Sequence, residues 1–589
     1  MDCNRLKYID VLKAFAIMAV VLYHSGFMAY GYLGVDVFLV ISGYLTTKSL
    51  QRRLLADNGG AGEGYLGFEF DRIVRLLPLL LIAGATCMAL AFWTMLPDDY
   101  ENLSESVVAT NLFGNNVLTA ITTKNYWDVV NEYKPLMHTW YVGVLMQFYI
   151  VYPILFYLAR LDRKKPQRTL LVLVSGMAVL SLLVFFGTAD LSRRFYYLPS
   201  RLFEFAAGGI VALLWESGQK NKASTNKWLA CIPVLSLLAL LVINKAFVPD
   251  AFRLMAVVVL TSMSLMFCGA LENKVMANGL LAGIGAACYS IFVWHQVLLA
   301  FYRYTVSSQF TAVSYVSFLA ITAGLSWLTY HFIESKTGKW LKEARARKVF
   351  LALLMVAFLV LTGFAGYIYK AGGVVRDVPE LYITKNEHVD HKAYNDKIYE
   401  LDKPFETDKR HWLVVGNSFG RDFANVILES AVSGRVEISY IYIDDYKKSD
   451  YAERFSTADK VFLSSSGTDE ALVEEVGQVC EMNGVDTRDL IVVGAKNFGE
   501  SNGQFYAKRH DPLYFEQRAK IAAEYIERND RMKEEYGDRY LDLIGLVLDA
   551  DGKVPVFTPD HHFVSQDCRH FSKGGAIWFG QLIDWERFL

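Results

Sequence analysis

Three ionisable residues lie inside the first long apolar segment of the sequence, residues 8–24. They are Asp10, Lys13 and His24, and each is costly to place in hydrocarbon, which makes it a candidate for a functional site. The spacings of three and eleven residues match one and three helical turns, so all three side chains can share one helix face. Lys13 and His24 would then lie ~16 Å apart along the axis, too far to act on the same atom. A second interpretation is equally good: Lys13 extends toward one membrane boundary and His24 lies at the other.

A serine, an aspartate and a histidine in the last third of the chain have the spacing of a nucleophilic triad. The segment HWLVVGNSFGRDFANVILES predicts a strand, a turn that carries Ser418, and a helix whose first backbone N–H groups favour developing negative charge. In DCRHFSKG, Asp567 precedes His570 by three positions, so the carboxylate can orient the imidazole while the other ring nitrogen reaches Ser418. Serine also caps many helices for structural reasons alone. The prediction of a triad therefore depends on both motifs together.

The elements that position the first group are predicted to be membrane helices. Eleven apolar stretches before residue 372 are near the ~20 residues that cross a bilayer. Lys and Arg gather in the connecting segments on the side of the N-terminus, which predicts a cytoplasmic N-terminus. Eleven spans then place everything after residue 371 outside the cytoplasm. The predicted spans are 8–24, 33–48, 76–96, 137–159, 169–187, 199–216, 228–245, 253–271, 279–301, 310–333 and 349–370.

The last third of the chain predicts a different environment for the serine. After Ala371 the composition turns polar and charged, and short β-rich runs such as 411–415 and 490–493 alternate with helical patterns such as 514–530. This alternation predicts a parallel α/β domain. The expected organisation is a membrane domain of about ten helices over 1–348, a further membrane helix over 349–371, a linker or extension over 372–408 and an α/β domain over 409–589.

The composition limits the class of protein. With 53% hydrophobic and 20% charged residues and a formal net charge of -2, the chain is not a disordered protein. It also lacks the basic excess of a nucleic-acid binder, so we expect no nucleic-acid partner. The seven cysteines show neither a C-x-x-C pair nor zinc-ligand spacing, so we expect no metal site.

Residues 8–47 resemble the opening of the acyltransferase-3 family of membrane acyl-transfer proteins. The resemblance covers the R/K-x10-H motif, here Lys13 and His24, and the following G-V-D-V-F element, which begins at Gly34. Further blocks follow in family order, namely FEFDRIVRLLP, PLMHTWYVGVLMQFY, LPSRLFEFAAGG, YSIFVWHQ and YHFIE. In one departure, Leu145 and Met146 stand where the family usually shows a Glu-Glu pair.

Side-chain chemistry suggests roles for the residues of the first span and for two arginines of these blocks. Arg72 and Arg75 suit the phosphates of a coenzyme A ester, because guanidinium groups bind phosphate bidentately. Ordinary anchoring at a cytoplasmic helix end is a nearly equal interpretation of both arginines. His24 is expected to act as a general base on an acceptor hydroxyl or to carry the acyl group. Lys13 is expected to complement the charge of Asp10 or of the thioester donor.

Other polar residues of the same blocks are expected to be structural. Glu204 is three residues after Arg201 and is expected to form an ion pair rather than to act as a base. His138 and His295 are expected near the outer membrane face, where a merely interfacial position is one interpretation of each.

The C-terminal pattern resembles the SGNH esterase and acyltransferase family, whose D-x-x-H motif lies near the end of the domain. The matching candidates for the oxyanion hole are the backbone N–H of Ser418, Gly467 in SSSGTD and Asn497 in VVGAKNFG. The sequence departs from the family's common G-D-S at Asn417 and places Lys496 before Asn497. These departures leave the nucleophile untouched but weaken the assignment of Asn497.

Together the two resemblances imply a bacterial enzyme of the inner or plasma membrane that O-acylates a cell-envelope or secreted polysaccharide. We expect an acyl-CoA, in particular acetyl-CoA, as donor substrate rather than as a tightly bound cofactor. Lipopolysaccharide O-antigen, exopolysaccharide and peptidoglycan all fit as acceptors. Two rival functions are a transporter or flippase that binds substrate without covalent chemistry, and an outward-facing esterase anchored by the membrane helices.

Overall fold

The chain forms two compact units in the computed structural model, which describes residues 7–55, 61–122, 131–214, 227–243, 249–267, 279–384, 391–466 and 468–589. The first unit comprises Met1–Leu90, Leu103–Arg303 and Ser308–Gly366. The second comprises Ala91–Asn102, Tyr304–Ser307 and Tyr367–Leu589. The domain boundaries expected from the sequence stay predictions.

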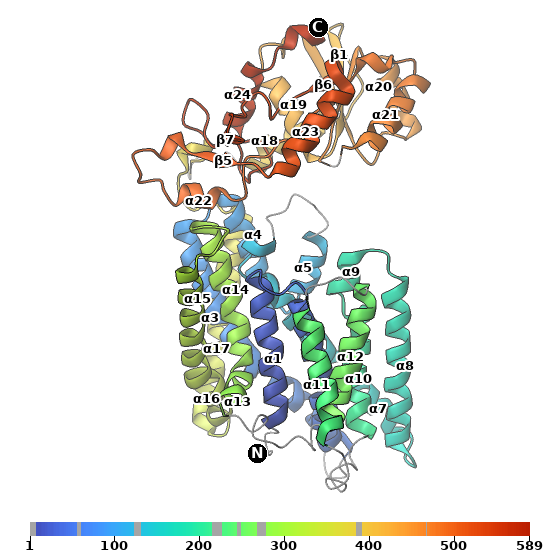
Figure 1. Cartoon of the computed structure of the whole chain (residues 1–589), viewed down its shortest axis with the longest axis vertical. Coiled ribbons are helices and arrows are strands. Elements are labelled where there is room, and N and C mark those ends of the chain that lie inside the picture. The colour runs from blue at the N-terminus through green and yellow to red at the C-terminus, as the bar shows by residue number, and fades with distance from the viewer. Residues whose placement is uncertain are drawn as a thin grey trace. The chain divides into compact units, whose positions relative to one another are not determined.

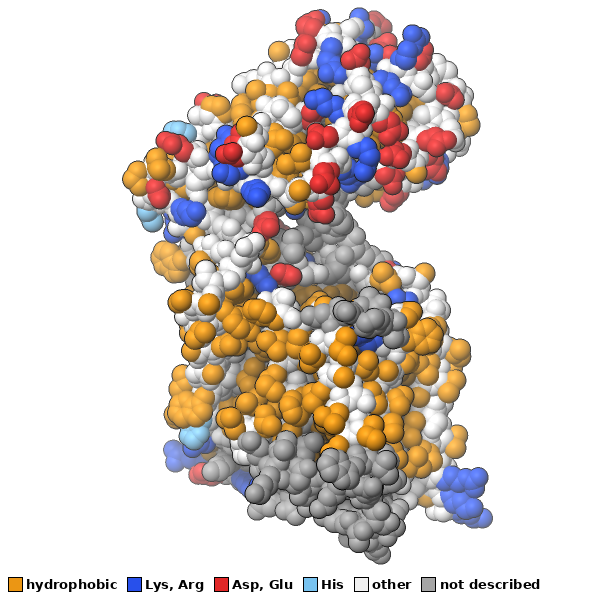
Figure 2. All heavy atoms as spheres, in the orientation of Figure 1, with side chains coloured by type: hydrophobic (Ala, Val, Ile, Leu, Met, Phe, Trp, Pro, Cys, Tyr) orange, Lys and Arg blue, Asp and Glu red, His pale blue; other side chains and the backbone are white. Residues whose placement is uncertain are grey.

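The first unit is a bundle of helices (Figure 1). Its side chains in Figure 2 are mostly apolar on the visible face, as expected for helices that contact lipid. The helices of this part of the chain are α1 (Lys7–His24), α2 (Gly34–Leu50), α3 (Ala61–Thr94), α4 (Pro97–Asn111), α5 (Asn115–Thr122), α6 (Trp140–Val151), α7 (Pro153–Arg160), α8 (Pro166–Gly187), α9 (Leu191–Tyr196), α10 (Leu202–Leu214), α11 (Lys227–Val242), α12 (Asp250–Phe267), α13 (Gly279–Ala286), α14 (Cys288–Thr305), α15 (Ala312–Thr329), α16 (Ser335–Trp340) and α17 (Ala344–Lys370).

Each of the eleven stretches predicted to span the membrane falls on one of these helices or on a pair of them. By length and apolarity, six helical stretches among the described residues can cross a membrane, or seven if the bent pair α13 and α14 counts as one span. Helices α10 and α11 are apolar but shorter. The helical, membrane-like character of this region is therefore confirmed, and the number eleven stays a prediction. The six stretches are Gly31–Arg53, Gly64–Thr94, Met137–Arg160, Pro166–Gly187, Ala312–Gly338 and Arg345–Lys370.

Glycines allow helices α2 and α10 to pack closely. A Cβ atom at Gly208 of α10 would lie 1.9 Å from the carbonyl oxygen of Val40 in α2. A Cβ atom at Gly43 of α2 would lie 2.0 Å from the carbonyl oxygen of Phe205. Small residues at such crossings are typical of membrane helices, because backbones can then approach closely. The crossing fixes α2 against α10.

The second unit contains a parallel five-stranded sheet, so the predicted parallel α/β domain is confirmed. The strand order is β2-β1-β3-β4-β6, and a separate antiparallel pair joins β5 to β7. The strands are β1 (Arg410–Gly416), β2 (Val436–Tyr442), β3 (Lys460–Ser464), β4 (Leu490–Val493), β5 (Arg518–Lys520), β6 (Tyr540–Leu541) and β7 (Lys553–Pro555). The helices of this unit are α18 (His391–Asp396), α19 (Ser418–Leu428), α20 (Ala452–Ser456), α21 (Glu470–Met482), α22 (Asn502–Tyr506), α23 (Ala523–Tyr536) and α24 (Lys573–Leu582).

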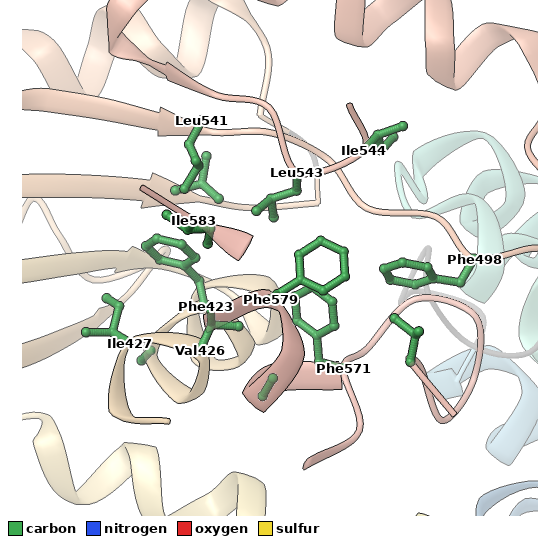
Figure 3. Close-up of a cluster of buried hydrophobic side chains, with 14 of the residues drawn as sticks. Phe423, Val426, Ile427, Phe498, Leu541, Leu543, Ile544, Phe571, Phe579 and Ile583 are labelled. Carbon is green, nitrogen blue, oxygen red and sulfur yellow. The ribbon is translucent and has the colours of Figure 1, made fainter. Parts of the chain in front are cut away.

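The sheet is buried on both faces, which explains its nearly continuous apolar strands. Trp412 and Val414 of β1 belong to one buried cluster, and Leu413 and Val415 belong to the other. Figure 3 shows the first cluster, in which Phe571 lies beside side chains of α24 and near those of α19. Because Phe571 directly follows His570, this packing anchors the segment that carries the predicted catalytic histidine.

Candidate active sites

The structure brings Ser418, His570 and Asp567 together in the second unit. His570 Nδ1 donates to Asp567 Oδ2 at 2.6 Å, and His570 Nε2 lies 2.9 Å from Ser418 Oγ. A carboxylate can only accept, so the proton of the neutral ring is on Nδ1 and Nε2 is left to accept from the serine hydroxyl. This is the arrangement of a nucleophile, a general base and an orienting carboxylate.

Electrostatics suits the same roles. Burial opposes ionisation of Asp567, but the charge of His570 and hydrogen bonds from the backbone N–H groups of His570 and Arg569 outweigh it and hold the pKa of Asp567 well below its usual value. Burial also disfavours the charged form of His570, yet the carboxylates of Asp567 and Asp422 raise the pKa of His570 above its usual value. The site can therefore stabilise the imidazolium that forms when His570 takes a proton.

Close packing at the end of β1 positions Ser418 as the first residue of α19. A Cβ atom at Gly416 would lie 1.9 Å from the carbonyl oxygen of Ser464, so glycine is required where β1 turns against β3. Asn417 caps α19 by accepting from the backbone N–H of Phe419 at 3.0 Å, and its amide donates to Ser466 Oγ at 2.7 Å. Asn417, which replaces the aspartate of the common G-D-S motif, thus gives the turn a hydrogen-bond donor as well as an acceptor.

Two of the three candidates for the oxyanion hole lie among the described residues, and Gly467 lies outside them. Asn497 Oδ1 accepts from the backbone N–H of Gly499 at 2.9 Å and from Arg569 Nη1 at 3.0 Å. These two donors identify the amide oxygen, which leaves the Nδ2 group of Asn497 as a donor. The geometry is compatible with the predicted role, which stays a prediction.

A buried carboxylate that the sequence analysis missed joins the segments of this site. Asp422 lies four residues after Ser418, forms an ion pair with Lys496, and accepts from the backbone N–H of Phe571 at 3.0 Å. Burial opposes ionisation of Asp422, but the charges of Lys496 and His570 hold its pKa below the usual value. Lys496 before Asn497 was the available signal, because a lysine in an apolar loop needs a buried partner.

In the first unit, three histidines from distant parts of the chain form a cluster. His24 is the last residue of α1, and its Nδ1 lies 2.9 Å from Nε2 of His295 in α14. The ring of His138, which lies just before α6, is 5.5 Å from the ring of His295. His138 and His295 are buried at 1% and 0% exposure, so the expectation that they are merely interfacial is replaced by packing inside the bundle beside His24.

A cavity of about 830 Å³ opens beside this cluster, and we call it the histidine cavity. Its wall includes aromatic and charged side chains as well as two of the histidines. These residues include Tyr23, His24, Asp36, Glu132, His138, Trp140, Tyr141, Arg201 and Phe292.

A second cavity of about 110 Å³, which we call the arginine cavity, is lined by three more of the predicted residues of the bundle. Lys13, Arg72 and Arg75 line it, and Lys13 Nζ lies 3.4 Å from Asp10 Oδ1. Tyr141 and Phe292 line both cavities. Lys13 and His24 therefore face different cavities with common wall residues, whereas the helix spacing had predicted that both line one wall of a single cavity.

Comparison with known proteins identifies this bundle. The family model described as an acyltransferase domain matches residues 6–331, which is more than half of the chain. The chain belongs to the acyltransferase-3 family. The resemblance found in the sequence is thereby confirmed.

Relatives of this acyltransferase are named as O-acetyltransferases. A protein of Staphylococcus aureus (strain COL), provisionally named an O-acetyltransferase, is 23% identical over 537 residues, which cover 82% of this chain and 86% of that protein. O-acetyltransferase OatA of S. aureus (strain NCTC 8325 / PS 47) is 26% identical over 394 residues, 61% of this chain and 63% of OatA. The solved structures contain no match. The chain is thus an O-acyltransferase.

The acyltransferase bundle also shows where the family's usual carboxylates would lie. Leu145 lines the arginine cavity, whereas Met146 is buried and is not among its lining residues. At position 145, the cavity is therefore lined by the apolar side chain of Leu145 instead of a carboxylate.

A buried ion group lies at the wall of the histidine cavity. Arg201 Nη1 donates to Glu204 Oε1 at 2.7 Å and to Asp36 Oδ1 at 2.8 Å. The expected ion pair of Glu204 is present, and Asp36 of α2 is an additional partner that the sequence spacing did not reveal. The group ties α2 to α10.

Proposed function

We propose that this acyltransferase moves an acyl group, in particular acetyl, from a cytoplasmic acyl-CoA across the membrane to hydroxyl groups of a cell-surface or secreted polysaccharide. The observation that carries the proposal is the presence of two reactive centres in one chain, a histidine centre in the helical bundle and a Ser-His-Asp triad in the α/β unit. In this proposal the N-terminus is cytoplasmic and the α/β unit lies outside the cytoplasm. Lipopolysaccharide O-antigen, exopolysaccharide and peptidoglycan are the candidate acceptors.

The arginine cavity is the proposed entrance of the donor. Arg72 and Arg75 would bind coenzyme A phosphates, and Lys13 would complement the negative charge that develops on the thioester oxygen. Arg72 lies over the rings of Phe68 and Tyr149, at 4.8 and 5.1 Å, which holds its guanidinium in place. Acyl transfer would then occur at His24, across the wall that the two cavities share.

Ser418 is the proposed second acceptor of the acyl group. Its oxygen attacks the acyl carbon while His570 Nε2 takes the hydroxyl proton, and the N–H groups of Ser418 and Asn497 stabilise the oxyanion. The incoming carrier leaves with the proton from His570, and Ser418 remains as an ester. A sugar hydroxyl then attacks this ester, gives its proton to His570, and releases Ser418, which regains that proton.

Ester content of the envelope glycans, measured by NMR in cells, tests the proposal. We expect Ser418→Ala and His24→Ala each to abolish the ester signal, whereas Ser449→Ala, at an exposed serine of the same unit, should leave it unchanged. A wild-type signal with Ser418→Ala or His24→Ala would remove that centre from the route. A rise in ester content with Ser418→Ala would instead support an outward esterase.

Purified protein in liposomes separates transfer from transport. The proposed enzyme consumes acyl-CoA and releases coenzyme A when acceptor is supplied, whereas a flippase leaves the thioester intact. Membership in an acyltransferase family favours the first outcome.

A further inference from the structure

The proton positions in the pair of His24 and His295 follow from the backbone of α14. His295 Nδ1 lies 3.1 Å from the carbonyl oxygen of Ile291, one helical turn earlier. A carbonyl oxygen can only accept a hydrogen bond, so Nδ1 of His295 carries a proton. In a neutral ring the other nitrogen, Nε2, then carries a lone pair and can only accept.

This assignment determines the tautomer of the next ring. His24 Nδ1 lies 2.9 Å from His295 Nε2, and one of the two nitrogens must donate. Because Nε2 of the neutral His295 has no proton, Nδ1 of His24 is the donor. Nε2 of His24 is therefore the nitrogen with the free lone pair. For two neutral rings no other arrangement satisfies both contacts.

The surroundings favour two neutral rings. Arg303 Nη2 donates to the backbone carbonyl of His24 at 2.6 Å, so a guanidinium charge already lies beside the pair. Glu132, 3.4 Å from Arg303, is largely exposed and offsets only part of this charge. A part-buried imidazolium beside a guanidinium is unfavourable unless an anion compensates its charge, and among the described residues no carboxylate is within hydrogen-bond distance of either ring.

The cavity distinguishes the functions of the two rings. His24 lines the histidine cavity, whereas His295 is fully buried and is not among the residues that line it. His295 can therefore influence a bound substrate only through its neighbours, and His24 is the neighbour whose ring lies at hydrogen-bond distance from its Nε2. Its relation to His24 is that of Asp567 to His570, with a neutral ring in place of a carboxylate.

We propose that His295 is a positioning residue that holds His24 in the Nδ1-protonated tautomer and so keeps Nε2 of His24 as the base of the membrane-stage acyl transfer. The proposal rests on the proposed function of His24. In that step Nε2 takes the proton of an acceptor hydroxyl as its oxygen bonds to the thioester carbonyl carbon. The carbon–sulfur bond breaks, and the leaving thiolate receives the proton from Nε2. One ester and one free thiol result.

The tautomer is measured directly by ¹⁵N NMR of the full-length, histidine-labelled protein in lipid nanodiscs, with His24 signals assigned by their loss in His24→Gln. We expect a protonated Nδ1 and an unprotonated Nε2 on His24 in the resting protein. A protonated Nε2 on resting His24 overturns the proposal. Because this readout needs no substrate, it is independent of whether the proposed function is correct.

Two substitutions test the consequence for transfer. His295→Gln keeps an acceptor oxygen for the Nδ1 proton of His24, whereas His295→Phe keeps a ring without an acceptor. We expect coenzyme A release to fall ~100-fold or more in His295→Phe and by a much smaller factor in His295→Gln. Thermal unfolding of each variant identifies those that fail to fold, and His331→Gln, at an exposed histidine of the same unit, is the control.

The outcomes separate the positioning role of His295 from the proposed function of His24. A folded His295→Phe protein with wild-type transfer, or equal losses in folded His295→Phe and His295→Gln proteins, contradicts the positioning role. If His24→Ala transfers at the wild-type rate while the NMR tautomer is as expected, the proposed function of His24 fails although the assignment of the protons holds.

Discussion

At the scale of single residues, the role of Asp567 in orienting His570 can be tested by one substitution. Asp567 holds the proton of His570 on Nδ1, and Asp567→Asn would present a donor to that nitrogen and favour the wrong tautomer. We expect acyl transfer through Ser418 to fall by ~10³ to 10⁴-fold, with little change in thermal stability. Asp584→Asn, at an exposed carboxylate of the same unit, is the matched control. A loss of less than tenfold would mean that Asp567 does not orient the base.

The raised pKa of His570 gives the triad a predicted pH dependence. Asp567 and Asp422 overcome burial and raise the pKa of His570, so the ring keeps its proton to higher pH than a free histidine. The base must be neutral to accept the serine proton, so acylation of Ser418 should rise with pH and have its midpoint above the usual value of ~6.5. The rate at which the His24→Ala protein hydrolyses a soluble acyl ester, measured as a function of pH, gives this midpoint without a contribution from His24. A midpoint at or below that of free histidine would contradict the assignment.

The residues of the two centres differ in how far the sequence could predict them. Asp567 and His570 are three positions apart, so their contact is a local property that spacing reveals. His24 and His295 are 271 positions apart, and no local pattern in either segment predicts that α1 and α14 place Nδ1 of His24 2.9 Å from Nε2 of His295. Asp422 was missed for the same reason, since its partner Lys496 lies 74 positions away.

At the scale of elements, Asp422 links α19 to the segments that carry Asn497 and His570. Asp422→Asn leaves Lys496 buried without its counter-charge, and we expect it to destabilise the second unit by ~3 kcal/mol or more. Replacing both groups, as in Asp422→Leu with Lys496→Met, removes the unpaired charge and should recover most of this stability. Chemical unfolding followed by tryptophan fluorescence measures both effects.

The double variant also tests what the ion pair does for catalysis. It should remain less active than the wild type even if it is equally stable, because the backbone of Phe571 loses its acceptor beside His570. Equal destabilisation by the single and double variants would show that the charge of Lys496 is not the cause.

The crossing of α2 and α10 makes a separate prediction. Gly208→Ala places a Cβ atom where the carbonyl oxygen of Val40 lies, so the two helices must move apart, and we expect a loss of ~1–3 kcal/mol. Gly176→Ala is the matched control, because a Cβ atom at that helical position meets no atom within 4 Å. The yield of monodisperse protein in detergent and its thermal unfolding provide the comparison. Equal behaviour of the two variants would show that the close approach does not matter.

Elements with a long apolar run or a clear alternation were predictable, and short or partly polar helical segments were not. Apolar runs located the membrane-like helices, and alternation of strands and helices identified the parallel sheet, since both patterns report burial directly. The helical pattern predicted over 514–530 was wrong in its first half, where the chain forms β5 (Arg518–Lys520) before α23 begins at Ala523. Helix α3 begins at Ala61, well before the predicted membrane span at 76, because its first turns mix charged residues with apolar ones and so lack the continuous apolar run that marks a span. The short helices α5 and α9 were missed, since each is below the length at which periodicity is informative.

At the scale of the whole molecule, the proposed order of the two centres can be tested by supplying the acyl group at different points. If His24 acts before Ser418, His24→Ala blocks acyl-CoA from reaching the serine but leaves the triad able to react. A soluble activated acyl ester added on the side of the α/β unit should then restore acylation of the glycan in His24→Ala vesicles.

The same ester should fail to rescue Ser418→Ala, in which the group that must receive it is missing. Mass spectrometry of Ser418 after acid quenching, together with glycan ester content by NMR, follows both stages in one sample. The comparison is informative because one chain and one acceptor serve both variants, and only the position of the block differs. Rescue of Ser418→Ala, or failure to rescue His24→Ala although its triad still hydrolyses the ester, would mean that the two centres do not act in this series.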